Sequence, residues 1–85
     1  MRSFIATVTY KKGKGKDVVE DVAEVAEKAK RWFHILTLNV QEIGDNIVYR
    51  LHLQPRPECD CVLCTALGRL KDSLPRHPEV TMRNA

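Results

Sequence analysis

Three cysteines, Cys59, Cys61 and Cys64, lie within six positions, and the chain has no other cysteine. Thiolates are soft, charged donors that bind zinc or iron, and most structural zinc sites use four ligands. The Cys-x-Cys-x-x-Cys spacing supplies three, and His34 is the one residue expected at the same end of the fold that would complete the set. A metal site formed by these four residues is therefore one hypothesis.

Two other interpretations of the cysteines remain open. If Asp60 caps a helix, Cys61 is its first residue, where the helix dipole favours a thiolate, and Cys64 lies one turn further on. The pair would then be redox-active or disulfide-bonded. Alternatively the cysteines are small apolar packing residues, with Cys59 on the core stripe of the helix and Cys64 at its edge.

A second group of reactive side chains is basic. Lys11, Lys12, Lys14 and Lys16 alternate with Gly13 and Gly15 in a short stretch after a predicted strand. The topology predicted below places Arg76 at the same end, so these five cations would neutralise phosphates of a polyanion. The pattern lacks the Gly-x-x-x-x-Gly-Lys-Ser/Thr of a phosphate-binding Walker loop. A solvated basic loop is the alternative interpretation.

The elements that must position these residues follow from hydrophobic periodicity. Period-two alternation predicts strands, and apolar residues three or four apart predict amphipathic helices. The second predicted helix ends at the Pro-Arg-His-Pro segment that begins at Pro75. The predicted elements are strands over 3–10, 34–43 and 46–54, a helix from Asp17 to Phe33, a second helix over 60–74, and a short last strand around Val80 and Met82.

Gly44 and Asp45 predict a tight hairpin turn between the two middle strands. In that register Val40 faces Tyr49, Leu38 faces Leu51 and Leu36 faces Leu53, with every pair directed inward. The resulting order, β-α-β-β-α-β, resembles the ferredoxin-like fold across the whole chain. We therefore expect one α+β domain over residues 1–85, with a four-stranded antiparallel sheet and both helices packed on one face.

Such a sheet leaves its other face open, and polar residues alternate onto it. Asn39, Arg50, His52 and Arg83 are expected there and would contact RNA backbone and bases. RNA-binding domains of this fold stack bases on sheet aromatics, whereas here Phe4 and Tyr49 alternate inward. The apolar residues expected on the open face suit a second copy of the chain, so a homodimer through the sheet face or an edge strand is also predicted; they are Ile5, Ile35 and Val48.

The bulk composition limits the class of protein. The 85 residues carry a net charge of +3, which permits a polyanionic partner without requiring one. No apolar run reaches the roughly 18 residues of a membrane span, and the N-terminus resembles a strand rather than a signal peptide. No catalytic set or cofactor motif is assembled. We expect a cytoplasmic, non-enzymatic module that binds nucleic acid, RNA in preference to DNA; a thiol-redox or metal-binding protein and an oligomerising assembly subunit are the alternatives.

Overall fold

The chain alternates strands and helices in the predicted order. The computed structural model describes residues 2–11, 18–57 and 62–85, with the backbone alone for 18–21. Neither described helix is long and apolar enough to cross a membrane. The elements are β1 (Phe4–Lys11), α1 (Val18–Ala29), β2 (Phe33–Ile43), β3 (Asn46–Pro55), α2 (Leu63–Ser73) and β4 (Glu79–Asn84).

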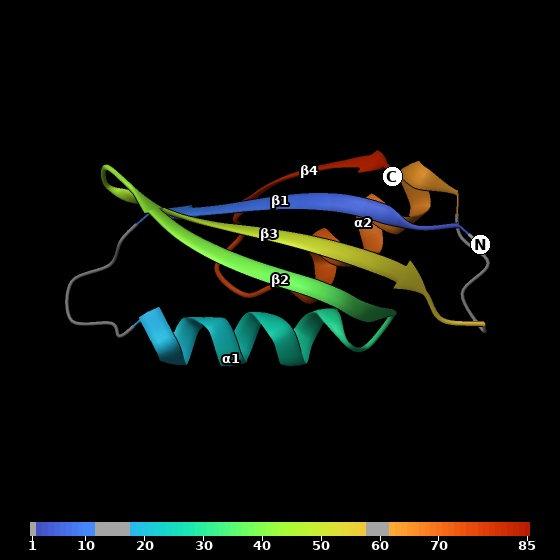
Figure 1. Cartoon of the computed structure of the whole chain (residues 1–85), viewed down its shortest axis with the longest axis horizontal. Helices are drawn as coiled ribbons and strands as arrows, with labels where there is room; N and C mark the ends of the chain where they lie inside the picture. The colour runs from blue at the N-terminus through green and yellow to red at the C-terminus, as the bar shows by residue number, and fades with distance from the viewer. Residues whose placement is uncertain (1, 12–17, 58–61) are drawn as a thin grey trace.

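All four strands form one antiparallel sheet in the order β2-β3-β1-β4. Both helices lie on the same side of the sheet and leave the other side uncovered (Figure 1). The predicted ferredoxin-like α+β fold is therefore confirmed. The hairpin is also confirmed, because β2 ends at Ile43, β3 begins at Asn46, and Gly44 between them has a φ of 59°. That left-handed conformation favours glycine.

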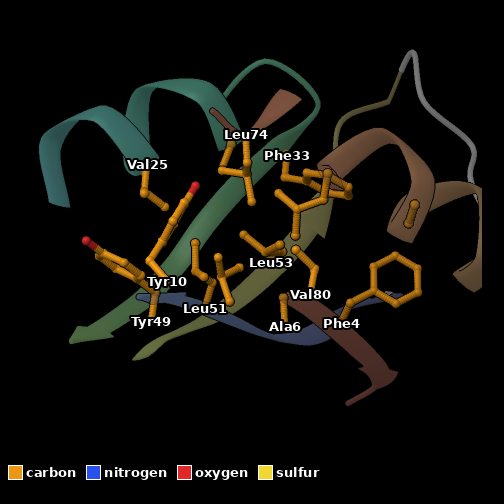
Figure 2. Close-up of a cluster of buried hydrophobic side chains, with 14 of the residues drawn as sticks. Phe4, Ala6, Tyr10, Val25, Phe33, Tyr49, Leu51, Leu53, Leu74 and Val80 are labelled. Carbon is orange, nitrogen blue, oxygen red and sulfur yellow. The ribbon is translucent and has the colours of Figure 1, made fainter. Parts of the chain in front are cut away.

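The core lies between the sheet and the helices. Inward-facing strand residues such as Phe4, Tyr49 and Leu53 meet Val25 of α1 and Leu70 of α2, and all five are fully buried. Figure 2 shows the strand side chains rising from the sheet toward the helices. Alternation along every strand sends one set of side chains into this core and the other set to the open face.

The first helix is shorter than predicted. It ends at Ala29, and Lys30, Arg31 and Trp32 form a turn in which the Trp32 amide donates to the Ala29 carbonyl at 3.3 Å. Phe33 is the first residue of β2 and is buried. The apolar spacing of Trp32 and Phe33 fits the end of a helix as well as the start of a strand. A prediction from periodicity alone therefore made the helix one turn too long.

The predicted pairing of Leu36 with Leu53 is wrong. Leu53 faces Ile35, and the register shifts between Ile35 and Thr37, so Leu36 is an extra residue in a β-bulge. Ile35 packs against the core and Leu36 is 50% exposed, the reverse of the predicted orientation. The same shift places His34 opposite Gln54. A bulge adds one residue to one strand and interrupts alternation, which a strict period of two does not represent.

The second helix starts later than predicted, at Leu63 with Val62 as its N-cap. Cys64 is therefore the second helical residue, and Asp60 and Cys61, the expected cap and first residue, lie outside the described residues. Ala66, Leu70 and Leu74 are buried, and Leu63 and Leu67 pack against the core, so α2 presents an apolar face to the sheet, as expected of an amphipathic helix.

Candidate nucleic-acid interface

The open face of the sheet brings the four binding residues that were predicted for it into one array. Three rows cross the strands in the order β2, β3, β1, β4, and the antiparallel register fixes the neighbours in each row. Arg50 and Thr7 are central in the middle row, with Arg83 one row away on β4. The rows read Thr37, His52, Ile5, Arg83; then Asn39, Arg50, Thr7, Thr81; then Gln41, Val48, Thr9, Glu79.

The two arginines of this array, Arg50 and Arg83, are exposed to solvent. Arg50 is exposed and donates to the Gln41 side-chain oxygen at 3.5 Å, at the long end for a hydrogen bond. Arg83 is exposed on the edge strand. It also lines a shallow hollow of about 150 Å³ with Ile5, Thr7, Thr81 and Met82. The hollow combines hydroxyl groups with a guanidinium, a pair of groups that suits an anionic oxygen.

His52 is half-buried in the first row, and its Nε2 lies 3.1 Å from the Oγ of Ser3. Ser3 is a contact that the sequence-based prediction missed. The signal for it was present, because Ser3 shares the alternation of Ile5 and Thr7 and so belongs to the same face. Glu79, in the third row, was also missed, and it places one carboxylate at the β4 edge of an otherwise basic surface.

The open face carries fewer exposed apolar side chains than predicted. Ile35 turns inward because of the bulge, and Val48 is only 9% exposed between its row neighbours Thr9 and Gln41. Of the three apolar residues predicted to be exposed there, Ile5 and Val48 lie on the face, but Ile5 is half-buried and Val48 is buried. The strands present no aromatic residue on this face, since their aromatic side chains are buried in the core; Figure 2 shows Phe4, Tyr10, Phe33 and Tyr49 there.

The predicted basic end is described in part. Lys11 is the exposed last residue of β1, whereas Lys12, Lys14 and Lys16 lie outside the described residues. Arg76 lies at this end, as predicted, with its guanidinium carbon 5.0 Å from the centre of the Tyr10 ring.

Arg76 is held by more than one contact. Its Nη2 is 3.7 Å from the Glu24 carboxylate. The backbone turns sharply here, because both Arg76 and His77 have positive φ. The Tyr10 hydroxyl donates to the Pro75 carbonyl at 2.9 Å. Burial raises the pKa of Tyr10 to about 12, with the nearby Arg76 charge acting in the opposite direction. The guanidinium of Arg76 therefore stabilises the connection between α2 and β4, whatever else it binds.

Cys64, the one cysteine among the described residues, lies at the opposite end, as predicted for the cysteine segment. Figure 1 shows β1 ending and the hairpin turning at one end of the sheet, and β3 ending near the start of α2 at the other. Cys64 is exposed with a free thiol, while Cys59 and Cys61 lie outside the described residues. His34 is exposed on β2. Within the described part of the chain, no cluster of three or more His, Cys, Asp or Glu side chains could hold a metal ion.

Comparison with known proteins supports the fold. No protein-family model and no curated protein matches the chain. Among solved structures, the chain is similar to the C-terminal domain of the MgtC protein from Mycobacterium tuberculosis, with a TM-score of 0.66, 17% identity, and coverage of 99% of this chain and 87% of that one. An uncharacterised protein from Thermotoga maritima gives a TM-score of 0.55 at 15% identity over 99% of this chain and 94% of that one.

A protein of unknown function from Galdieria sulphuraria has a TM-score of 0.67 at 15% identity. The match covers 99% of this chain but only 44% of that one. The fold therefore occurs both as most of a small structure and as part of a larger chain. These similarities agree with the fold described above, a ferredoxin-like α+β arrangement.

Proposed function

We propose that this chain is a non-enzymatic module that binds nucleic acid, RNA in preference to DNA, through its open sheet face. The observation that carries the proposal is the array around Thr7, where Arg50 and Arg83 lie on strands to either side and one row apart, which puts their backbones about 12 Å from each other. Guanidinium groups bind phosphate oxygens, and the threonine and asparagine side chains beside them are hydrogen-bonding partners for sugars and bases. His52 contributes a further polar group.

Without exposed aromatics on the sheet, base stacking contributes little, so binding would rest on phosphate contacts and depend weakly on sequence. Lys11, the last residue of β1, and the three lysines that follow it would extend the contact beyond this end of the sheet. Lys11 is placed at that end by its pairing with Asn46. A polyanion that follows β1 toward its end would meet this lysine after passing Arg50.

The test is fluorescence polarisation of labelled single-stranded RNA and DNA at low salt. The double variant Arg50→Ser with Arg83→Ser should bind at least about tenfold more weakly, because two phosphate contacts are lost. The matched control is Lys28→Ser with Lys71→Ser, which removes the same charge from exposed positions on the two helices. Equal loss in both variants would indicate a net-charge effect and contradict a sheet-face site.

The lysines are tested separately. Replacing Lys11, Lys12, Lys14 and Lys16 with serine should weaken binding and reduce its salt dependence, since each phosphate contact releases counterions. Unchanged affinity in this variant would remove the lysines from the interface and leave the sheet face as the whole site.

We further propose a homodimer through the edge strand β2, which leaves the sheet face open for nucleic acid. Leu36 and Ile43 on this strand are 50% and 47% exposed, and both are large apolar side chains on an unpaired edge. If the protein is instead an assembly subunit with no nucleic-acid partner, the same dimer would form and the polarisation experiment would show no binding.

A thiol function is the second candidate, and the exposed thiol of Cys64 in the first turn of α2 favours it. Exposed free thiols persist in reducing compartments, in keeping with the cytoplasm that we propose for this protein. Thiol titration with and without reductant separates the possibilities. Three free thiols and no bound metal would remove both a Cys61–Cys64 disulfide and a metal site of Cys59, Cys61, Cys64 and His34.

A further inference from the structure

Two arginines from different elements lie over one indole ring at the end of the molecule opposite to the lysines. The guanidinium carbon of Arg69, on α2, is 4.4 Å from the ring centre of Trp32, and that of Arg31 is 5.4 Å from it. Both distances fall within the range of cation–π contacts. Trp32 is half-buried against the core, so its ring is a fixed platform.

A third arginine fixes the turn that carries this platform. The Arg56 amide donates to the Trp32 carbonyl at 3.2 Å, and its Nε donates to the Lys30 carbonyl at 2.8 Å. The end of β3 thereby holds the turn after α1 at two points. The main chain of the turn that carries Trp32 is therefore held by two hydrogen bonds from Arg56, neither of which involves Arg31 or Arg69.

The described residues of this turn and its contacts carry several positive charges. They are Lys30 and Arg31 in the turn, Arg56 bonded to it and Arg69 over the ring, and Glu27 pairs with Lys30 at 3.7 Å between exposed side chains. An exposed pair of this kind contributes little and exchanges readily with other partners. Arg31 and Arg69 each contact the same indole ring, and this contact restricts the orientation of both guanidinium groups.

We propose that Trp32, Arg31 and Arg69 form a seat for the phosphate groups of a ligand. Guanidinium groups bind phosphate through paired N–H donors, and stacking on the ring orients them before binding, which lowers the entropy cost of ordering two long side chains. The seat lies on the helix side of the sheet, away from Arg50 and Arg83. It is a second anion-binding surface, independent of the sheet face.

The phosphate chemistry has two natural sources, a free phosphate compound and a nucleic-acid strand. Trp32 is the only tryptophan in the chain, so its fluorescence reports on this seat alone. Pyrophosphate, titrated at constant ionic strength against a sodium chloride blank, should change the emission of Trp32 saturably. Isothermal titration calorimetry of the same pair gives a second readout, and a response equal to the blank would overturn the proposal.

Variants separate the seat from general charge. Arg31→Ser with Arg69→Ser should weaken pyrophosphate binding at least about tenfold, and lysine at both positions should restore part of it, because lysine keeps the charge but loses the paired donors. Lys28→Ser with Lys71→Ser, the charge-matched control, should bind as the unaltered protein does. Circular dichroism verifies folding of each variant. Equal binding by the serine variant and the control would overturn the seat.

A single-stranded RNA is the second probe, and it separates this inference from the proposed function. RNA binding by polarisation with no pyrophosphate response at Trp32 overturns the seat and leaves the sheet-face function standing. A pyrophosphate response without RNA binding establishes the seat for a free phosphate compound and overturns the sheet-face function. A response to both probes, with RNA affinity lowered by either arginine pair, supports two contact surfaces on one strand.

Discussion

Arg50 and Arg83 differ from the other described arginines in what their side chains do for the fold. Arg56 fixes the turn after α1 through two hydrogen bonds, and Arg76 packs on Tyr10 beside Glu24. Arg50 donates a long hydrogen bond to Gln41 in the neighbouring row. Removing Arg50 or Arg83 should therefore alter binding without unfolding the protein, which makes them better probes of function than Arg76.

Tyr10 offers a test of the contacts at the lysine end. Tyr10→Phe removes the hydroxyl that donates to the Pro75 carbonyl and leaves the ring in the core. We expect the free energy of unfolding to fall by about 1 kcal/mol, the usual net value of such a hydrogen bond. Urea denaturation measures it, and an unchanged midpoint would show that the hydrogen bond does not stabilise the turn.

The same residue predicts a pH dependence. Burial raises the pKa of Tyr10 from 10.0 to about 12, so above pH 10 the unfolded chain loses this proton while the folded protein retains it. The unfolded state binds fewer protons there, and stability must decrease as pH rises from 10 to 12. The Tyr10→Phe variant should show a smaller decrease over this range. Parallel stability curves for the two proteins would contradict the raised pKa.

At the scale of elements, the β-bulge in β2 makes a prediction that a regular strand would reverse. Ile35 packs against the core and Leu36 is half exposed. Ile35→Ala should therefore cost about 2 kcal/mol of unfolding free energy, and Leu36→Ala about 0.5 kcal/mol or less. Chemical denaturation of the pair compares them directly. A larger loss of stability for Leu36→Ala than for Ile35→Ala would indicate that Leu36 is the inward residue, and it would contradict the bulge.

The start of α2 can be improved, because Val62 occupies the N-cap without a side-chain hydrogen bond and is 55% exposed. Asp at an N-cap accepts from a free amide of the first turn and interacts favourably with the helix dipole. Val62→Asp should raise stability by about 1 kcal/mol in thermal or urea unfolding, with Val62→Ala as the control that adds no acceptor. A stability gain in the alanine variant alone would place the helix start elsewhere.

Sequence periodicity predicted the element order, the hairpin and the inward residues of β1 and β3, because each of these depends on alternation over several residues. It failed where a single residue changes the pattern. The extra Leu36 moved Ile35 into the core, and the turn at Trp32 ended α1 before the apolar spacing did. The array of Asn39, Arg50, His52 and Arg83 was predictable from alternation. Each of these residues lies in a regular part of its strand, and Asn39 comes after the bulge in β2.

The arginine–tryptophan cluster could not be predicted in the same way. Arg31 adjoins Trp32 in sequence, but Arg69 joins them only through the packing of α2 beside the turn after α1. Contacts between helices depend on their relative placement on the sheet, and periodicity carries no information about it.

At the scale of the whole molecule, the exposed apolar residues of β2 predict self-association. Leu36→Lys with Ile43→Lys places two charges on the edge strand, which should turn a dimer into a monomer while the core is preserved. Light scattering after size-exclusion chromatography gives the mass of each form. A monomeric unaltered protein, or a variant that stays dimeric, would exclude the β2 edge as the interface.

The central claim is that the open sheet face binds the phosphates of nucleic acid, and the salt dependence of RNA affinity tests it most directly. The logarithm of the binding constant should fall linearly with the logarithm of salt concentration. Its slope should decrease in magnitude by about 1.4 in the Arg50→Ser, Arg83→Ser variant, because two phosphate contacts are lost on a single strand. An absence of binding at low salt, or the same slope in both proteins, would contradict the claim.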